Sequence, residues 1–357
     1  MSLEGMSEYA NVCLKVSRAN SVSVLEDLNQ QFGRLRIDNQ EHEAFTRQDV
    51  IVNVLKPYLS ATRELEFVTK DHACFEPVKR VREKWNIGDA PYINFVELLC
   101  GCLQFPLILL QNPSKRHTES FESMQTCPTI RWISRKLDGM GLELKQVSVL
   151  DICSLFSDDD LEQMSAHDRK CAREDAYKMT EDVLKILRPQ VIVCCQCKTR
   201  GVYSQGKCTW PPAENKLAND LCSNVAEARD RVATPLEVEG HSFWAVKGVH
   251  PMYVLYNPGK ENILNELFED MYYPCGAMIR LLRLIDSTEK LVAAFEFVSS
   301  SIRVAFSVTE NRVLLAENAG RLLDPTENHL AAIENFALHL QEGKHRITRH
   351  DGLLRLG

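Results

Sequence analysis

The stretch Phe105-Pro-Leu-Ile-Leu-Leu-Gln-Asn-Pro-Ser114 joins a short apolar run directly to a polar turn. A run of this length, bounded by turn residues, is typical of a buried strand that ends in a loop. Three later stretches have the same character, at 147–151, 190–195 and 242–249. Helical patterns separate these strands, so the sequence predicts an α/β fold. We expect a three-layer αβα sandwich around a mostly parallel, four-stranded central sheet.

Two helices between the predicted strands are well marked. Residues 129–140 place Ile130, Ile133 and Leu137 on one face of a helix. A second helix is expected to begin after the capping sequence Ser165-Ala-His-Asp168 and to end before Pro189, because apolar residues recur at helical spacing between these two signals.

The sequence predicts three regions. Residues 1–98 are expected to be helical, and residues 99–275 to form the α/β domain. Residues 276–357 are expected to form an α+β region of helices and a short hairpin packed on that domain. In this last region the helical pattern extends to about Phe297, residues 302–308 alternate as a strand does, and Asp324-Pro325 caps a final amphipathic helix.

Composition excludes several classes of protein. The 357 residues are 45% apolar and 25% charged, which is too apolar for a disordered chain. A net charge of -7 rules out an overall basic field. We expect no membrane-spanning segment, because the apolar runs are short. The polar N-terminus predicts no secretory signal. Because the 13 cysteines are also scattered, we expect an intracellular protein of the nucleus or cytoplasm. The cysteine spacing predicts no metal site, and no cofactor is expected.

Polar residues follow three of the predicted strands: Asn112, Asp151 and His250. Ligands of open α/β sheets bind at the carboxyl ends of the strands. An amide there can hold a water next to a sugar carbon, although it is not a base at neutral pH. A neutral imidazole can donate a hydrogen bond to a departing base. The pattern therefore suits cleavage of an N-glycosidic bond.

These residues resemble the uracil-DNA glycosylase superfamily. The first motif is Leu109-Leu-Gln-Asn-Pro-Ser114 and the second is Val249-His-Pro251. Val149-Leu-Asp151 and the helix, Pro, strand unit at 187–193 lie between them in the order that the family shows. The resemblance covers about 105–258. It implies that Asn112 positions the attacking water, that His250 stabilises the leaving base, and that Asp151 reads a flipped base.

The departures from the family pattern bear on specificity. Ser114 stands where enzymes strict for uracil carry a Tyr, so the pocket could admit larger pyrimidines, and Asp151 replaces the usual Asn. Met252 and Tyr253 replace a phosphate-contacting Ser and the Pro after it. The remaining site residues are assigned by position: Gln111 and Phe121 to the base pocket, Lys115 and Arg116 to the phosphate backbone, and Val254 or Leu255 to the apolar wedge.

Simpler interpretations of the same residues stay open. Asn112 could be a turn residue, His250 a packed side chain, and Asp151 a cap on its strand. The chain is therefore predicted to be a divergent, monofunctional DNA glycosylase, with a catalytically inactive binding or scaffold protein of the same fold as the alternative. An unrelated α/β enzyme acting on a small molecule is a third possibility. DNA is the expected partner, and residues 1–98 could bind a protein.

Overall fold

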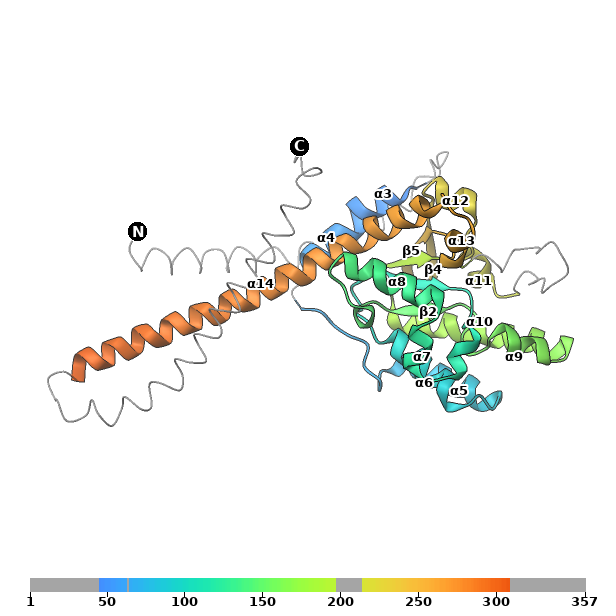
Figure 1. Ribbon diagram of the computed structural model, residues 1–357, viewed down its shortest axis with the longest axis horizontal. Coiled ribbons are helices and arrows are strands. Elements are labelled where there is room, and N and C mark those ends of the chain that lie inside the picture. The colour runs from blue at the N-terminus through green and yellow to red at the C-terminus, as the bar shows by residue number, and fades with distance from the viewer. Residues whose placement is uncertain (1–44, 63, 197–213, 309–357) are drawn as a thin grey trace. The chain divides into compact units, whose positions relative to one another are not determined.

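The computed structural model describes residues 45–62, 64–196 and 214–308 (Figure 1). The chain divides into two compact units, Met1–Gly276 and Ala277–Gly357, and the division falls within the long helix α14. The expectations for residues 1–44 and for the final helix after Asp324 lie outside the described residues.

A five-stranded sheet forms the centre of the first unit. Its strand order is β2-β1-β3-β5-β4. The four strands β2, β1, β3 and β5 are parallel, whereas β4 runs antiparallel to β5. Their bounds are β1 Leu107–Leu110, β2 Val149–Asp151, β3 Val191–Cys194, β4 Ala233–Val238 and β5 His241–Lys247. The predicted α/β class with a mostly parallel sheet is confirmed.

The predicted count of four strands is wrong, because β4 is a fifth strand at the edge. Its side chains alternate between buried and exposed, and Pro235 lies in the middle of it. A Pro argues against a central strand, since it cannot donate to the sheet, but an edge strand tolerates it. The apolar runs that marked the other four strands are buried on both faces, and β4 has no such run.

Helices account for most of the remaining described residues. The predicted helices at 129–140 and after Ser165 correspond to α8 and α10 to within about a residue. The helices are α3 Arg47–Val50, α4 Lys56–Ala61, α5 Glu76–Lys84, α6 Asp89–Leu99, α7 Phe121–Gln125, α8 Pro128–Gly139, α9 Asp158–Gln163, α10 Ala166–Leu187, α11 Lys216–Asp220, α12 Val225–Arg229, α13 Pro251–Tyr256 and α14 Glu261–Val308, with a π-helical turn η1 Ile51–Leu55 and 3-10 turns η2 Ala73–Phe75, η3 Lys115–Thr118 and η4 Leu144–Gln146.

The described part of the N-terminal region, residues 45–98, is largely helical and contacts the edge of the sheet. The carbonyl oxygen of Phe45 accepts a hydrogen bond from Ala233 at 2.8 Å, and Arg47 donates to the carbonyl of Arg231 at 2.7 Å. The buried Arg47 guanidinium also lies 2.9 Å from the Asp270 carboxylate on α14. Residues 45–98 therefore share a compact unit with the sheet.

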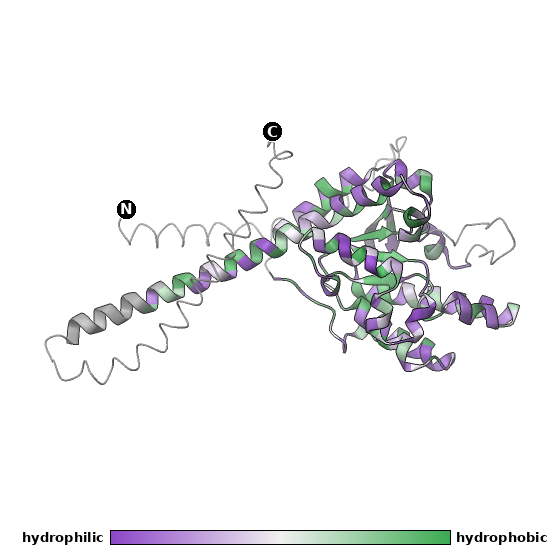
Figure 2. Cartoon of the chain, in the orientation of Figure 1, coloured by the Kyte–Doolittle hydropathy of each residue, from purple (hydrophilic) through white to green (hydrophobic). Residues whose placement is uncertain are grey.

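One face of the sheet is covered by α10. Ala176, Met179 and Val183 of this helix belong to the same buried cluster as Leu109 of β1 and Ile192 of β3. Each of the larger side chains, the Met, Val, Leu and Ile, contributes about 1.5–3 kcal/mol when it leaves water. In Figure 2 the centre of the sheet is mainly hydrophobic, whereas the helices around it carry both hydrophobic and hydrophilic residues.

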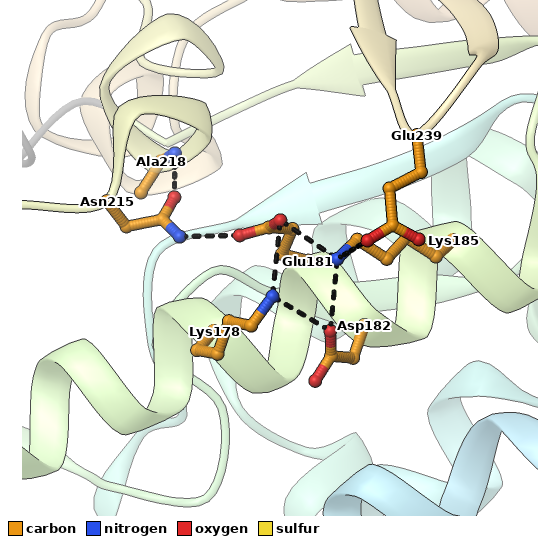
Figure 3. A network of polar contacts seen from close by, with 7 residues as sticks. All are labelled: Lys178, Glu181, Asp182, Lys185, Asn215, Ala218 and Glu239. Carbon is orange, nitrogen blue, oxygen red and sulfur yellow. Dashed lines mark hydrogen bonds and ion pairs between the residues drawn. The ribbon is translucent and has the colours of Figure 1, made fainter.

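Ion pairs and hydrogen bonds join the outer side of α10 to its neighbours (Figure 3). The Lys185 ammonium lies 3.1 Å from Glu181 and 2.7 Å from Glu239, which follows β4. Hydrogen bonding to Glu239 raises the pKa of Lys185. Asn215 donates to Glu181 at 2.8 Å and accepts from the Ala218 amide at 2.9 Å, so it also caps α11. The network fixes α11 and the β4–β5 turn against the helix.

The predicted strand at 302–308 is wrong, because α14 extends to Val308. Ile302, Val304, Phe306 and Val308 alternate, but residues 302 and 306, like 304 and 308, are also four positions apart, which is a helical spacing. Such short apolar runs do not separate a strand from a helix. No helix among the described residues has the length and apolarity that would be needed to cross a bilayer.

Gly101 allows a close approach of two backbone segments. A Cβ atom at this position would lie 2.2 Å from the Ser148 amide nitrogen and 2.5 Å from the Val147 carbonyl carbon. We expect Gly101→Ala to lower the free energy of unfolding by about 3 kcal/mol, since backbone atoms must move to make room. Gly139→Ala on α8, where a Cβ meets nothing within 4 Å, is the matched control. Equal denaturation midpoints for the two variants would contradict this packing.

Candidate active site

The carboxyl ends of the four parallel strands β2, β1, β3 and β5 lie at the same end of the sheet. Backbone hydrogen bonds continue the pairing past the strands: Ile152 donates to Leu110 at 2.9 Å and Gly248 donates to Cys194 at 2.9 Å. Because β1 and β5 are separated only by β3, their ends lie two strand spacings apart, or about 10 Å. The chain therefore brings Asn112 and His250 to the same end of the sheet, although 138 positions separate them in the sequence. Asp151 ends β2, directly beside Leu110.

Asn112 is half-buried and its amide has a fixed orientation. Nδ2 donates to Oδ1 of Asp158, at the start of α9, across 3.2 Å. The carbonyl oxygen Oδ1 of Asn112 is thus the acceptor that remains for a water molecule. The contact also joins the loop after β1 to the loop after β2.

His250 is the N-cap of α13. Its Nδ1 atom accepts a hydrogen bond from the Met252 amide at 3.2 Å, which places the proton of the neutral ring on Nε2. The same capping contact occurs at His72, where Nδ1 accepts from the Cys74 amide at 3.2 Å. The hydrogen bond at Nδ1 of His250 is thus explained by helix capping. A catalytic role of His250 would have to use Nε2.

Asp151 lines a small cavity of about 10 Å³. Its side chain is buried, with 8% exposed, and burial raises the pKa of the carboxyl to about 7. His117 of η3 lines the same cavity, and burial lowers the pKa of its imidazole to about 4. The other lining residues are Pro91, Phe95, Leu98, Pro113, Val149 and Leu155. A cavity of this size holds one water molecule, so a nucleobase can enter only if its walls move.

The other residues assigned to the base pocket have varied positions. Gln111 is buried, Ser114 is exposed, and Phe121 is half-buried at the start of α7. Phe121 does not line the cavity beside Asp151; the aromatic ring there is that of Phe95 on α6. Sequence reasoning missed Phe95 because it placed residues 1–98 in a separate region. Nothing near His117 in the sequence indicated that it is buried.

The residues assigned to DNA contact differ in exposure. Lys115 is exposed and lies 3.2 Å from Asp159, and the Arg116 guanidinium donates to the Thr126 hydroxyl. Val254 is only 2% exposed, so it is part of the core and is not positioned to act as a wedge. Leu255, at 45%, is exposed on α13, as is Tyr256 beside it. Of the two residues predicted to form the apolar wedge, only Leu255 is exposed.

A buried lysine and a serine hold the end of the sheet together. Lys247 donates to the carbonyl oxygens of Asp220 and Cys222 at 2.5 and 2.8 Å. The Ser223 hydroxyl lies 2.7 Å from the carbonyl oxygen of Gly248 and 3.0 Å from that of Cys194. These contacts fix the strand end from which His250 follows. The sequence analysis does not identify this cluster, and the signal that could have done so is Lys247, a lysine within the apolar stretch of β5.

Within the part of the chain that the structure describes, no three His, Cys, Asp or Glu side chains are grouped as metal ligands. Neither protein-family models nor curated protein sequences match this chain. The resemblance to the uracil-DNA glycosylase superfamily consequently rests on the ordered motifs alone.

Proposed function

We propose that the chain is a divergent DNA glycosylase that hydrolyses the N-glycosidic bond of a flipped, damaged or modified base. The observation that carries the proposal is that Asn112 and His250 follow the carboxyl ends of β1 and β5, two parallel strands with only β3 between them. The proposal includes the three-layer αβα arrangement that the resemblance implies, and an intracellular location with DNA as partner.

In this proposal the two side chains act on opposite ends of one bond. The Asn112 carbonyl oxygen holds the water that attacks the sugar carbon, in the orientation set by the bond to Asp158. The Nε2 proton of His250 is donated in a hydrogen bond to the departing base, where negative charge develops. The strand ends lie about 10 Å apart, so both side chains can reach a single nucleotide once the cavity wall has moved.

Asp151 is the residue proposed to read the base. With a pKa of about 7, its carboxyl group is partly protonated at neutral pH. The protonated form offers one donor and one acceptor, as an amide does, whereas the ionised form only accepts. The protonated form therefore suits a base edge that presents an acceptor next to a donor. Admission of any base requires displacement of the cavity wall, and Pro113 and His117 belong to the loop after β1 that could supply this movement.

A local basic surface should give the binding of DNA a salt dependence. We expect the double variant Lys115→Gln, Arg116→Gln to reduce the slope of log affinity against log salt by about 1.4–1.8, because each phosphate contact contributes about 0.7–0.9. Lys145→Gln is the matched control, since Lys145 is also exposed and ion-paired, 2.7 Å from Glu143. Binding of oligonucleotides with no salt dependence would contradict a phosphate-contacting surface.

The catalytically inactive scaffold is the second candidate, and the water-sized cavity favours it. Release of a free base from a modified oligonucleotide separates the two candidates. An enzyme releases the base, whereas a scaffold binds the oligonucleotide and leaves it intact.

A further inference from the structure

Three consecutive aspartates at the start of α9 have three different partners. Asp158 accepts from the Asn112 amide at 3.2 Å, Asp159 lies 3.2 Å from the Lys115 ammonium, and Asp160 accepts from the Ser157 amide at 2.9 Å in a capping box. Asp160 therefore stabilises the helix, and Asp159 is paired at the surface. Asp158 alone of the three contacts a residue of the proposed catalytic pair.

The proposed reaction needs a group that Asn112 cannot supply. Water that adds to the sugar carbon must lose a proton, and an amide oxygen does not take up a proton at neutral pH. A carboxylate does so readily, and general bases of this kind contribute about 10²–10⁴-fold to rate. Nδ2 of the Asn112 amide is bound to the Asp158 carboxylate at 3.2 Å, so a water held by Oδ1 on the side of Nδ2 would lie beside that carboxylate.

We propose that Asp158 is the general base of the reaction and that it also holds the Asn112 amide in its working orientation. This inference rests on the proposed function. The water oxygen forms the new bond to the sugar carbon, and the carbon–nitrogen bond to the base breaks with its electron pair leaving on the base. The water proton passes to Asp158, while His250 Nε2 donates a hydrogen bond to the departing base. The base then takes a proton from solvent, and Asp158 returns its own proton to solvent.

The position of Asp158 is compatible with this role. It is the first residue of α9, follows the N-cap Ser157 and is half-buried, so that it is in contact with solvent and with the amide. The sequence contains no signal for it, since none of the family motifs includes this loop. Only the pairing of β1 with β2 brings the two loops together.

The test compares single-turnover base release by full-length variants. We expect Asp158→Asn, which retains an acceptor for Asn112 Nδ2, to slow release about 10²-fold with unchanged oligonucleotide affinity. Asp158→Ala should be slower still, and added formate should restore part of its rate by supplying a carboxylate. Asp159→Asn is the control, because it removes the same charge one residue away without touching Asn112.

The outcomes separate this inference from the proposed function. A rate for Asp158→Asn within twofold of the wild type, with Asn112→Ala slow, would overturn the role of Asp158 and leave the glycosylase proposal intact. Equal losses in Asp158→Asn and Asp159→Asn would also overturn it, since charge alone would then explain the effect. A wild-type protein that releases no base would overturn both.

Discussion

Replacing Asp151 by asparagine should make the free energy of unfolding rise with pH between about 4 and 6.5, a window in which the Asp151 and His117 effects cancel in the wild type. The folded protein holds a proton on Asp151 up to a pKa of about 7, whereas an ordinary Asp loses it near 3.8. Between these values the folded state binds more protons than the unfolded state, so stability falls as pH rises. The full effect is about 4 kcal/mol, because each pKa unit corresponds to about 1.4 kcal/mol.

His117, in the same cavity, has the opposite effect. Its pKa is lowered from 6.5 to about 4, so the unfolded state binds the extra proton and stability rises with pH across that window, by about 3 kcal/mol. The two effects offset one another in the wild type between pH 4 and 6.5. In Asp151→Asn only the His117 effect should remain, so stability should rise with pH between about 4 and 6.5. In His117→Gln only the Asp151 effect should remain, so stability should fall as pH rises from about 4 to 7.

Urea unfolding between pH 4 and 8 measures these slopes. Asp138→Asn, which removes an exposed carboxyl on α8, is the control and should run parallel to the wild type. If the profile of Asp151→Asn also runs parallel to the wild type, Asp151 does not hold a proton in the folded state. The proposal that a protonated Asp151 recognises a base edge as an amide would is then contradicted as well.

Loss of either proposed catalytic side chain should slow base release by about 10²-fold or more. Single preorganised groups that stabilise developing charge commonly contribute this much. For His250 the variant is His250→Asn, because Asn is a good N-cap and retains the start of α13. His72→Asn is the matched control, since His72 makes the same capping contact away from the site.

For Asn112 the variant is Asn112→Ala, with Asn219→Ala on α11 as control. Affinity for the oligonucleotide should change little in each case, because the groups act on the reacting bond. Wild-type rates in His250→Asn would show that the imidazole only caps its helix. Wild-type rates in Asn112→Ala would show that the amide is only a turn and loop contact.

The central sheet could be predicted from the sequence because its strands are continuous apolar runs. β4 could not, since an edge strand with Pro235 lacks that signal. The run 302–308 was misassigned because its alternation also fits a helix, which α14 continues. The distinction between Val254 and Leu255 depends on the phase of α13: adjacent residues point about 100° apart, so one is buried and the other exposed.

Of the candidate site, the strand-end residues could be predicted and their surroundings could not. Asn112, Asp151 and His250 follow from the general position of ligand sites in α/β sheets. The Asp158 contact, the burial of His117 and the place of Phe95 depend on packing between segments far apart in the chain. The pKa of Asp151 depends on the same burial and has no counterpart in the local sequence.

Mass spectrometry of oligonucleotides incubated with the wild-type protein tests the central claim most directly. Substrates carrying uracil, hydroxymethyluracil, a deaminated purine or a mismatch are each compared with a normal duplex and single strand. We expect a free base and an intact strand with one abasic site from at least one of them. Oligonucleotides that bind the protein and are recovered unchanged in every case would contradict it.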